Sequence, residues 1–247
     1  MDTIKFDKSD VKMIAHRGLS GIESQNTMSA FVAACNRSYW GVESDVHVTK
    51  DGKFIMFHDD TVMGMTGLEM PRVEECTFDE LRSLTLNNVC SIQGEEGCKP
   101  DRKDLVIPSL DEYIAICKKY SRKCILEIKN LVTKEDVKNI VNVIKELDYL
   151  DGVVFISFQI GNLIMLRELL PNQPLQYLLA EYTDEAGADM DKYNLDLDIY
   201  YNNLTKEIVD LMHSKNHLVN CWTCDEPEAA KQLSAWGVEY ITTNILE

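Results

Sequence analysis

The feature that most constrains the fold is a regular alternation of short, apolar, β-branched segments with longer segments of helical period. The segments expected to be strands are Val11–Ala15, Trp40–Val48, Lys53–Phe57, Lys123–Lys129, Gly152–Phe158, Leu175–Ala180, Asp196–Tyr201, His217–Cys224 and Val238–Thr243. The expected helices are Thr27–Arg37, Thr77–Leu84, Ser109–Tyr120, Thr133–Leu147, Leu163–Leu169, Lys206–Ser214 and Pro227–Trp236. Such alternation predicts parallel strands that are covered by helices.

One pair of strands departs from this pattern. Asp51-Gly52 joins the second expected strand to the third, and this dipeptide is a strong signal for the tight turn of an antiparallel hairpin. Without the return strand, eight strands remain. They predict an α/β fold, a closed (β/α)8 barrel (the TIM barrel), as a single domain over residues 1–247. An open doubly wound sheet is the alternative, but the chain has no glycine-rich dinucleotide fingerprint.

The alternation also fails between Thr61 and Pro108, where we expect one short helix and a long polar stretch, Asn87–Asp104. Long loops are uncommon in compact domains unless they are functional or disordered. We therefore expect residues 61–108 to form an insertion, placed after the hairpin, that folds over one end of the barrel. It should influence substrate preference and contribute little to the stability of the barrel.

Charge and cysteine usage limit the partners and the compartment. Lys and Arg total 25 against 41 Asp and Glu, and the formal charge of −16 disfavours nucleic acid and anionic membranes as partners. No apolar run is long enough for a membrane span, and the first residues lack the pattern of a signal peptide, so we expect a cytoplasmic protein with reduced thiols. The CxxC pair, Cys221 and Cys224, is expected on opposite faces of one strand, which disfavours redox and zinc roles.

Titratable and cationic residues follow the ends of the expected strands, where the active sites of such barrels lie. His16 and Arg17 follow the first strand, and His58 follows the return strand of the hairpin. Either histidine alone is as compatible with a core position as with catalysis. The adjacent Arg17 and the acidic residues at neighbouring strand ends favour catalysis.

Carboxylates gather at the same end of the predicted barrel. Glu43 and Asp45 are two residues apart, so their side chains point the same way, and Glu127 and Lys129 repeat this spacing. Carboxylates that converge repel one another unless a cation lies between them. Three oxygen ligands from different strands suit Mg²⁺ or Ca²⁺.

Together these residues form motifs that resemble the glycerophosphodiester phosphodiesterase family. The motifs are HRG at 16–18, Asn26-Thr27, ESDVHVTKDG at 43–52, HDD at 58–60, LEIK at 126–129 and Trp222-Thr223. They extend over nearly the whole chain in the order of the family, and the combination is highly specific. The resemblance implies a (β/α)8 barrel with a small insertion after the HD motif, in agreement with residues 61–108.

The resemblance also implies a reaction and roles for individual residues. A small-molecule glycerophosphodiester would be hydrolysed to sn-glycerol 3-phosphate and an alcohol, with one divalent metal. The implied metal ligands are Glu43, Asp45 and Glu127, the acid–base pair is His16 and His58, and the phosphate oxygens are held by Arg17 and Lys129. Trp222 is expected either in the core or as a wall of the substrate site.

Three positions depart from the family pattern. Gln25 stands where the family usually has Glu, the stretch after His58 lacks the usual Arg, and Asn244 stands where Asp is common. None of the three belongs to the implied metal or acid–base set, so they bear on substrate preference. His47 is expected to have a structural role, and His213 with His217 to form a surface pair near the end of a helix.

Several alternatives stay open. A lysophospholipase-D-like or phospholipase-C-like activity on lipids would need an apolar groove, for which Leu84, Leu86, Val89 and Ile92 are the candidates. A barrel that binds phosphodiesters without turnover is the non-catalytic alternative. The sequence does not distinguish the acid from the base, water from a substrate hydroxyl as the nucleophile, or one oligomeric state from another.

Overall fold

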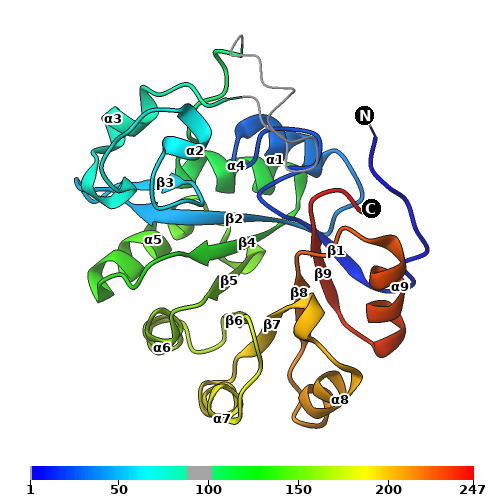
Figure 1. Ribbon diagram of the computed structural model, residues 1–247. Helices are drawn as coiled ribbons and strands as arrows, with labels where there is room; N and C mark the ends of the chain where they lie inside the picture. Colours follow the sequence, from blue (N-terminus) through cyan, green and yellow to red (C-terminus); the bar gives the residue numbers. More distant parts are fainter. Residues whose placement is uncertain (1, 88–101) are drawn as a thin grey trace.

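The computed structural model describes residues 2–87 and 102–247, and in it eight parallel strands close into a barrel (Figure 1). The barrel strands follow one another in chain order, and the last pairs with the first, Lys12 with Tyr240 and Ala15 with Thr243. They are β1 Lys12–Ala15, β2 Gly41–Val48, β4 Lys123–Ile128, β5 Val153–Ser157, β6 Leu175–Leu179, β7 Asp196–Tyr200, β8 Val219–Trp222 and β9 Tyr240–Thr243. The predicted (β/α)8 barrel is confirmed.

Helices surround the strands, and an apolar core fills the space between the two layers (Figure 1). The helices of this ring are α1 Met28–Cys35, α4 Leu110–Tyr120, α5 Lys134–Glu146, α6 Ile160–Leu169, α7 Asp184–Tyr193, α8 Lys206–Ser214 and α9 Pro227–Trp236. In α5 the residues that face the core, Val137, Ile140, Val141 and Ile144, recur at helical spacing. Thr133 and Asp136 form the capping box that starts this helix. Short 3₁₀ turns, η3 Leu150–Gly152 and η4 Tyr201–Asn203, complete the connections.

The expected hairpin is present. β3, Phe54–Met56, pairs antiparallel with β2, with Val46 opposite Met56 and Val48 opposite Phe54. Gly52 makes the turn at a φ of +74°, in the left-handed region that glycine adopts without strain.

The insertion has more structure than the sequence predicts. It contains α2 Met63–Thr66, the 3₁₀ turn η1 Val73–Glu75 and α3 Phe78–Arg82. Its apolar side chains form their own cluster with Ile55 and Phe57 of the hairpin. Leu84 and Leu86 pack into this cluster, so they do not line a groove. Val89, Ile92 and most of the expected polar stretch lie outside the described residues.

Three local expectations are wrong. Helix α7 was not expected, because its sequence is mostly polar and buries only Ala186, Gly187 and Met190. Strand β8 ends at Trp222, so Cys224 lies beyond the strand and packs into the same core as Cys221. His217 is not at the surface: α8 ends before it, and the buried ring lies 2.9 Å from the Asp191 carboxylate.

No helix in the described parts of the chain has the length and apolar character needed to cross a bilayer.

The contact between α4 and the barrel gives a stability prediction. The buried Tyr113 hydroxyl donates a 2.7 Å hydrogen bond to the Val42 carbonyl oxygen. Tyr113→Phe should lower the free energy of unfolding by about 1 to 2 kcal/mol, because it leaves a buried acceptor without this donor. The matched control is Tyr120→Phe on the same helix, whose hydroxyl bonds no described residue and which should change the value by less than about 0.5 kcal/mol. Urea unfolding measures both, and equal effects would contradict the assignment.

Candidate active site

The carboxyl ends of the barrel strands bring together the residues singled out in the sequence. A cavity of about 60 Å³ opens there. It is lined on one side by His16, Arg17, Glu43, His58 and Glu127. Asp45 and Lys129 are ion-paired with members of this set, and Trp222 lines the cavity from β8.

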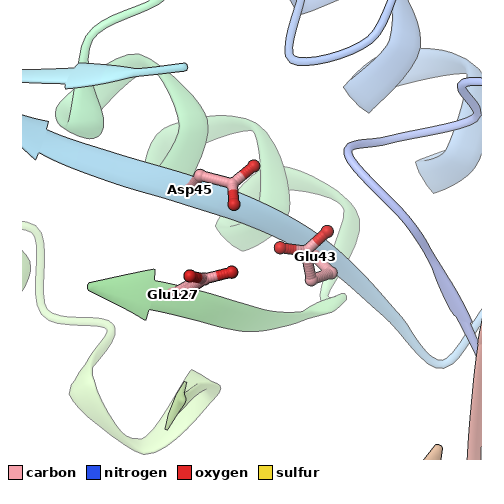
Figure 2. Close-up of side chains that lie close together, drawn as sticks. All are labelled: Glu43, Asp45 and Glu127. Atoms are coloured by element: carbon pink, nitrogen blue, oxygen red, sulfur yellow. The ribbon is translucent and has the colours of Figure 1, made fainter. Parts of the chain in front are cut away.

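Three buried carboxylates form the acidic cluster of the site (Figure 2). Glu43 and Asp45 project from β2 and Glu127 from β4, where Asp45 and Glu127 are paired in register. One oxygen of each lies within 4.8 Å of the others. This spacing, with oxygen donors alone, fits a hard divalent cation such as Mg²⁺ or Ca²⁺.

The three carboxyl groups of the acidic cluster differ in the direction of their pKa shifts. Burial and the neighbouring Asp45 raise the pKa of Glu127 to about 8, and the same two causes raise that of Glu43 well above its ordinary value. Burial would also raise the pKa of Asp45, but the charges of Lys129 and Arg17 outweigh it and lower that pKa. Without a metal, Asp45 is therefore ionised at neutral pH, and Glu127 retains a proton that a cation would displace. The raised pKa of Glu43 disfavours its charged form in the same way.

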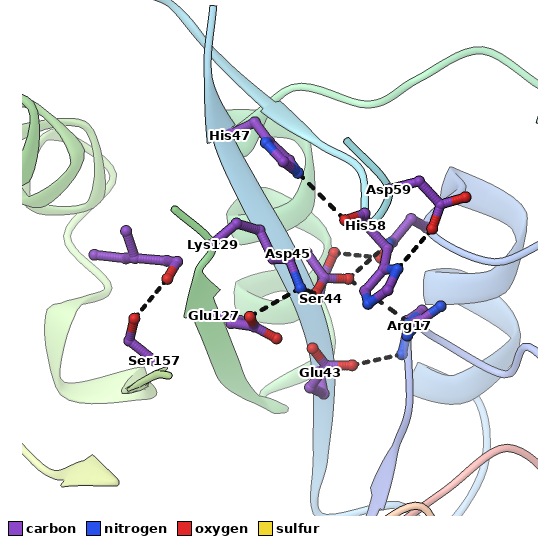
Figure 3. A network of polar contacts seen from close by, with 12 residues as sticks. Arg17, Glu43, Ser44, Asp45, His47, His58, Asp59, Glu127, Lys129 and Ser157 are labelled. Carbon is purple, nitrogen blue, oxygen red and sulfur yellow. Dashed lines mark hydrogen bonds and ion pairs between the residues drawn. The ribbon is translucent and has the colours of Figure 1, made fainter. Parts of the chain in front are cut away.

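Two cations border the acidic cluster (Figure 3). Lys129 Nζ lies 2.9 Å from Glu127 Oε1 and 3.5 Å from Asp45 Oδ1. Arg17 has a φ of +54°, a conformation that directs its backbone N–H to Glu43 Oε2 at 2.8 Å.

The Arg17 side chain contacts Gln25 and Asp45. Its Nη1 donates to Gln25 Oε1 at 2.7 Å, so the amide at position 25 supplies an acceptor without a charge. Its buried Nε has no hydrogen-bond partner among the described residues. That nitrogen lies 3.9 Å from Asp45 Oδ2, so its charge is directed at the acidic cluster.

His16 is fixed by Asn244, which the sequence analysis did not assign to the site and which Ser20 and Asp225 hold in turn. His16 Nδ1 lies 2.8 Å from Asn244 Oδ1. The Asn244 amide nitrogen donates to Asp225, and Ser20 donates to Asn244 Oδ1, which orients the amide with its oxygen toward the histidine. Nδ1 of His16 therefore carries the proton of this hydrogen bond, and Nε2 is left with the lone pair. Burial and the charge of Arg17 lower the pKa of His16 to about 3.

His58 follows β3 and lies on the same side of Asp45 as Arg17, whereas Glu127 and Lys129 lie on the other side (Figure 3). Its Nδ1 is 2.7 Å from Asp59 Oδ1, and this hydrogen bond lowers the pKa of Asp59 despite partial burial. His47 Nε2 is 3.4 Å from the His58 carbonyl oxygen, and His47 Nδ1 is 2.7 Å from Glu74 Oε1. His47 thus supports the backbone of His58, in agreement with its expected structural role.

Glu74 connects the insertion to the barrel, and the sequence analysis did not identify it. It accepts hydrogen bonds from His47 on β2 and from Asn130, which follows β4. Burial raises its pKa, but these two hydrogen bonds outweigh the burial and lower the pKa to about 2. The carboxylate is therefore ionised throughout the physiological range.

Removing this connection should affect catalysis indirectly. Glu74→Ala is expected to lower kcat about 10-fold, because a small displacement of His58 impairs proton transfer, while metal affinity stays within about twofold. The exposed neighbour Glu75 provides the control, since Glu75→Ala should leave kcat unchanged. Steady-state kinetics and metal titration measure both quantities. A normal kcat in Glu74→Ala would show that His58 does not depend on this support.

Trp222 forms a wall of the cavity, one of the two placements expected for it. Its ring meets Phe158 edge-on at a centroid distance of 5.6 Å and packs against Tyr200 at 5.5 Å. Its Nε1 is buried and has no hydrogen-bond partner among the described residues.

Buried carboxylates, two cations and two histidines at the mouth of a (β/α)8 barrel define a hydrolase that acts on phosphate esters. The model of the glycerophosphoryl diester phosphodiesterase family matches residues 16–247 of this chain. The chain belongs to that family and is therefore a phosphoric diester hydrolase.

Individual relatives extend over almost the whole chain. A glycerophosphodiester phosphodiesterase from Bacillus altitudinis is 28% identical over 244 residues, which cover 94% of each chain. The solved structure of a glycerophosphodiester phosphodiesterase from Parabacteroides distasonis is 25% identical, with a TM-score of 0.77, and covers 95% of this chain and 93% of its own. A phosphodiesterase from Oleispira antarctica, solved with the product sn-glycerol-3-phosphate, is 23% identical, with a TM-score of 0.83 over 94% of this chain and 92% of its own.

Proposed function

We propose that this protein hydrolyses small glycerophosphodiesters to sn-glycerol 3-phosphate and an alcohol, with one divalent ion, Mg²⁺ or Ca²⁺. The observation that carries the proposal is the buried acidic cluster, with three carboxylate oxygens within 4.8 Å of one another, beside two cations and two histidines. Glu43, Asp45 and Glu127 would hold the ion. When bound, the ion would supply a positive charge next to the phosphoryl oxygens, where negative charge increases in the transition state.

Arg17 and Lys129 would bind the phosphoryl oxygens. Both are largely buried, and both are ion-paired with Asp45. Arg17 lines the cavity, and the terminal amine of Lys129 lies 2.9 Å from Glu127, which also lines it. Their charges are anchored before the substrate arrives, so little reorganisation is needed when it binds.

His16 would act as the base. Its lowered pKa keeps the ring neutral at neutral pH, and the Asn244 contact leaves Nε2 unprotonated. Nε2 can then accept a proton from the nucleophile, either water or a neighbouring substrate hydroxyl. His58, which Asp59 fixes through Nδ1, would deliver a proton from Nε2 to the leaving alkoxide.

Product analysis tests the proposal. Purified protein with Mg²⁺ or Ca²⁺ should convert glycerophosphocholine into sn-glycerol 3-phosphate and choline, which ³¹P NMR and a choline assay detect. The rate on lysophosphatidylcholine should be much lower, because Leu84 and Leu86 pack inward instead of lining an apolar groove. Faster turnover of the lysolipid would favour the lipid-directed alternative, and binding without turnover would favour the non-catalytic one.

A further inference from the structure

The loop between β8 and α9 carries a carboxylate, Asp225, that lies behind the proposed base and does not line the cavity. Asp225 Oδ2 is 2.6 Å from the Asn244 amide nitrogen, and Asn244 Oδ1 is 2.8 Å from His16 Nδ1. A carboxylate, an amide and an imidazole thus form one continuous chain of hydrogen bonds. The direction of donation along this chain decides which nitrogen of the neutral His16 ring carries the proton.

The contacts of Asp225 with the end of β9 fix the carboxylate as an acceptor. The Asn244 backbone N–H, which can only donate, points to Asp225 Oδ1 at 2.7 Å. The Thr243 hydroxyl donates to the same oxygen at 2.8 Å, while its own oxygen accepts from the Leu246 N–H at 3.1 Å. The carboxylate is therefore held at a set position, and its second oxygen accepts from the Asn244 side chain.

The oxygen end of the Asn244 amide is fixed in the same sense. Buried Ser20 donates to Asn244 Oδ1 at 2.7 Å, next to the His16 contact. Because Asp225 holds the amide nitrogen, the amide presents only its oxygen to the imidazole, and this oxygen can only accept. Nδ1 of His16 must therefore donate. The amide carries no charge, so it orients the ring without placing beside it a negative charge that would favour the imidazolium form.

We infer that Asp225 is a positioning residue of the reaction, which sets the tautomer of His16 through Asn244 and leaves Nε2 free to accept a proton. Its effect on the imidazole passes through the amide that lies between them. The inference rests on the proposed function, because the tautomer of His16 matters for turnover only if this histidine is the base.

An amide at position 225 should reverse the chain. In Asp225→Asn the side-chain oxygen can keep the contacts with Thr243 and the Asn244 backbone, but its NH₂ group then faces the NH₂ group of Asn244. Turning the Asn244 amide over removes this conflict and directs its NH₂ group to His16. Nδ1 must then accept, and the proton moves to Nε2. We expect kcat to fall on the order of 10²-fold and KM to stay within about threefold, because a histidine in the wrong tautomer cannot take the proton of the nucleophile.

Exchanging the two side chains should restore the chain. In the double variant Asp225→Asn with Asn244→Asp, the carboxylate at 244 can accept from His16 and Ser20, and the amide at 225 can donate to it. Most of the kcat lost in Asp225→Asn should therefore return, to within about tenfold of wild type. Asn244→Asp alone keeps the tautomer but places two carboxylates in contact, so it should mainly lower the Tm. If Asp225 only held the loop in place, the two losses would combine.

Steady-state kinetics on glycerophosphocholine and ¹⁵N NMR of the histidine rings test the inference. The His16 signals, identified by their absence in His16→Ala, should show a protonated Nδ1 in the wild-type protein and in the double variant. They should show a protonated Nε2 in Asp225→Asn. The exposed control Asp111→Asn should match wild type in both measurements. A normal kcat in Asp225→Asn, or a double variant no faster than Asp225→Asn, would overturn the inference.

The NMR measurement separates the inference from the reaction. If the wild-type protein hydrolyses no diester, the proposed function fails, and the ring tautomers still decide whether Asp225 acts through Asn244. A protonated Nε2 of His16 in the wild-type protein would overturn the inference whatever the kinetics show. If Asp225→Asn does not fold, the double variant is compared with Asn244→Asp instead. A higher Tm with an equal or higher kcat in the double variant supports the exchange, and a lower value of either overturns it.

Discussion

Glu43→Gln is expected to lower kcat/KM for glycerophosphodiesters on the order of 10³-fold and to abolish tight binding of the divalent ion. The substitution keeps the shape of the side chain and removes one of three clustered carboxylates. Because burial and the neighbouring Asp45 raise the pKa of Glu43 and so disfavour its charged form, a neutral side chain there should leave the stability of the metal-free protein nearly unchanged. The substitution should therefore impair metal binding and turnover without lowering the stability of the metal-free protein.

Thermal unfolding with and without Mg²⁺ separates these effects. The ion should raise the Tm of the wild-type protein and of the exposed control Glu146→Gln, because a ligand stabilises the state that binds it. It should leave the Tm of Glu43→Gln unchanged. A similar Mg²⁺-induced increase in Tm for Glu43→Gln would exclude Glu43 as a ligand.

The stabilisation by Mg²⁺ should also depend on pH. Glu127 has a pKa near 8 in the folded, metal-free protein, above its unfolded value, so ionising it costs stability as pH rises from about 4.5 to 8. Metal binding displaces the same proton, so the stabilisation by Mg²⁺ should increase over this window. A stabilisation that stays constant from pH 5 to 8 would contradict the raised pKa.

His16→Ala and His58→Ala should each lower kcat by roughly 10²- to 10⁴-fold, the usual range for loss of a general acid or base. The double variant should lose much less than the product of the two, because the histidines act in one step. Both single variants should retain metal affinity, since the carboxylates form the proposed ligand set. His213→Ala is the control, because that ring is exposed and pairs with Glu239 outside the site.

The two roles can be distinguished by the leaving group. A 4-nitrophenolate leaving group needs no proton, so aryl diesters should restore most of the rate in His58→Ala and little in His16→Ala. Rescue of His16→Ala instead would reverse the assignment.

The rate should be bell-shaped against pH. Since the pKa of His16 lies near 3, the acid limb between pH 8 and 5 should follow protonation of Glu127, and excess Mg²⁺ should shift this limb to lower pH.

The sequence predicts the parts of this protein that local patterns encode. Strand–helix alternation and the Asp51-Gly52 turn identify the barrel and its hairpin, because both depend on neighbours in the chain. The spacing of Glu43 and Asp45 places both carboxylates on one face of β2 for the same reason. Glu127 is expected beside them once β4 is known to pair with β2.

The support of the site depends on contacts between distant segments, and no local pattern predicts these. Asn244 reaches His16 across 228 positions, and Glu74 reaches His47 from an insertion that the sequence represents as mostly loop. In the sequence, Asp198 is one polar residue in a short strand, and only the closed barrel shows that its Oδ1 has no hydrogen-bond partner among the described residues. Helix α7 was missed because few of its residues are apolar.

The central claim is tested most directly by titrating metal back into chelator-stripped protein while following glycerophosphocholine turnover. We predict no measurable turnover before metal is added, full turnover at one Mg²⁺ or Ca²⁺ per chain, and no recovery in Glu43→Gln at the same concentrations. Full turnover of the stripped protein in excess chelator, or an equal recovery in Glu43→Gln, would contradict the account.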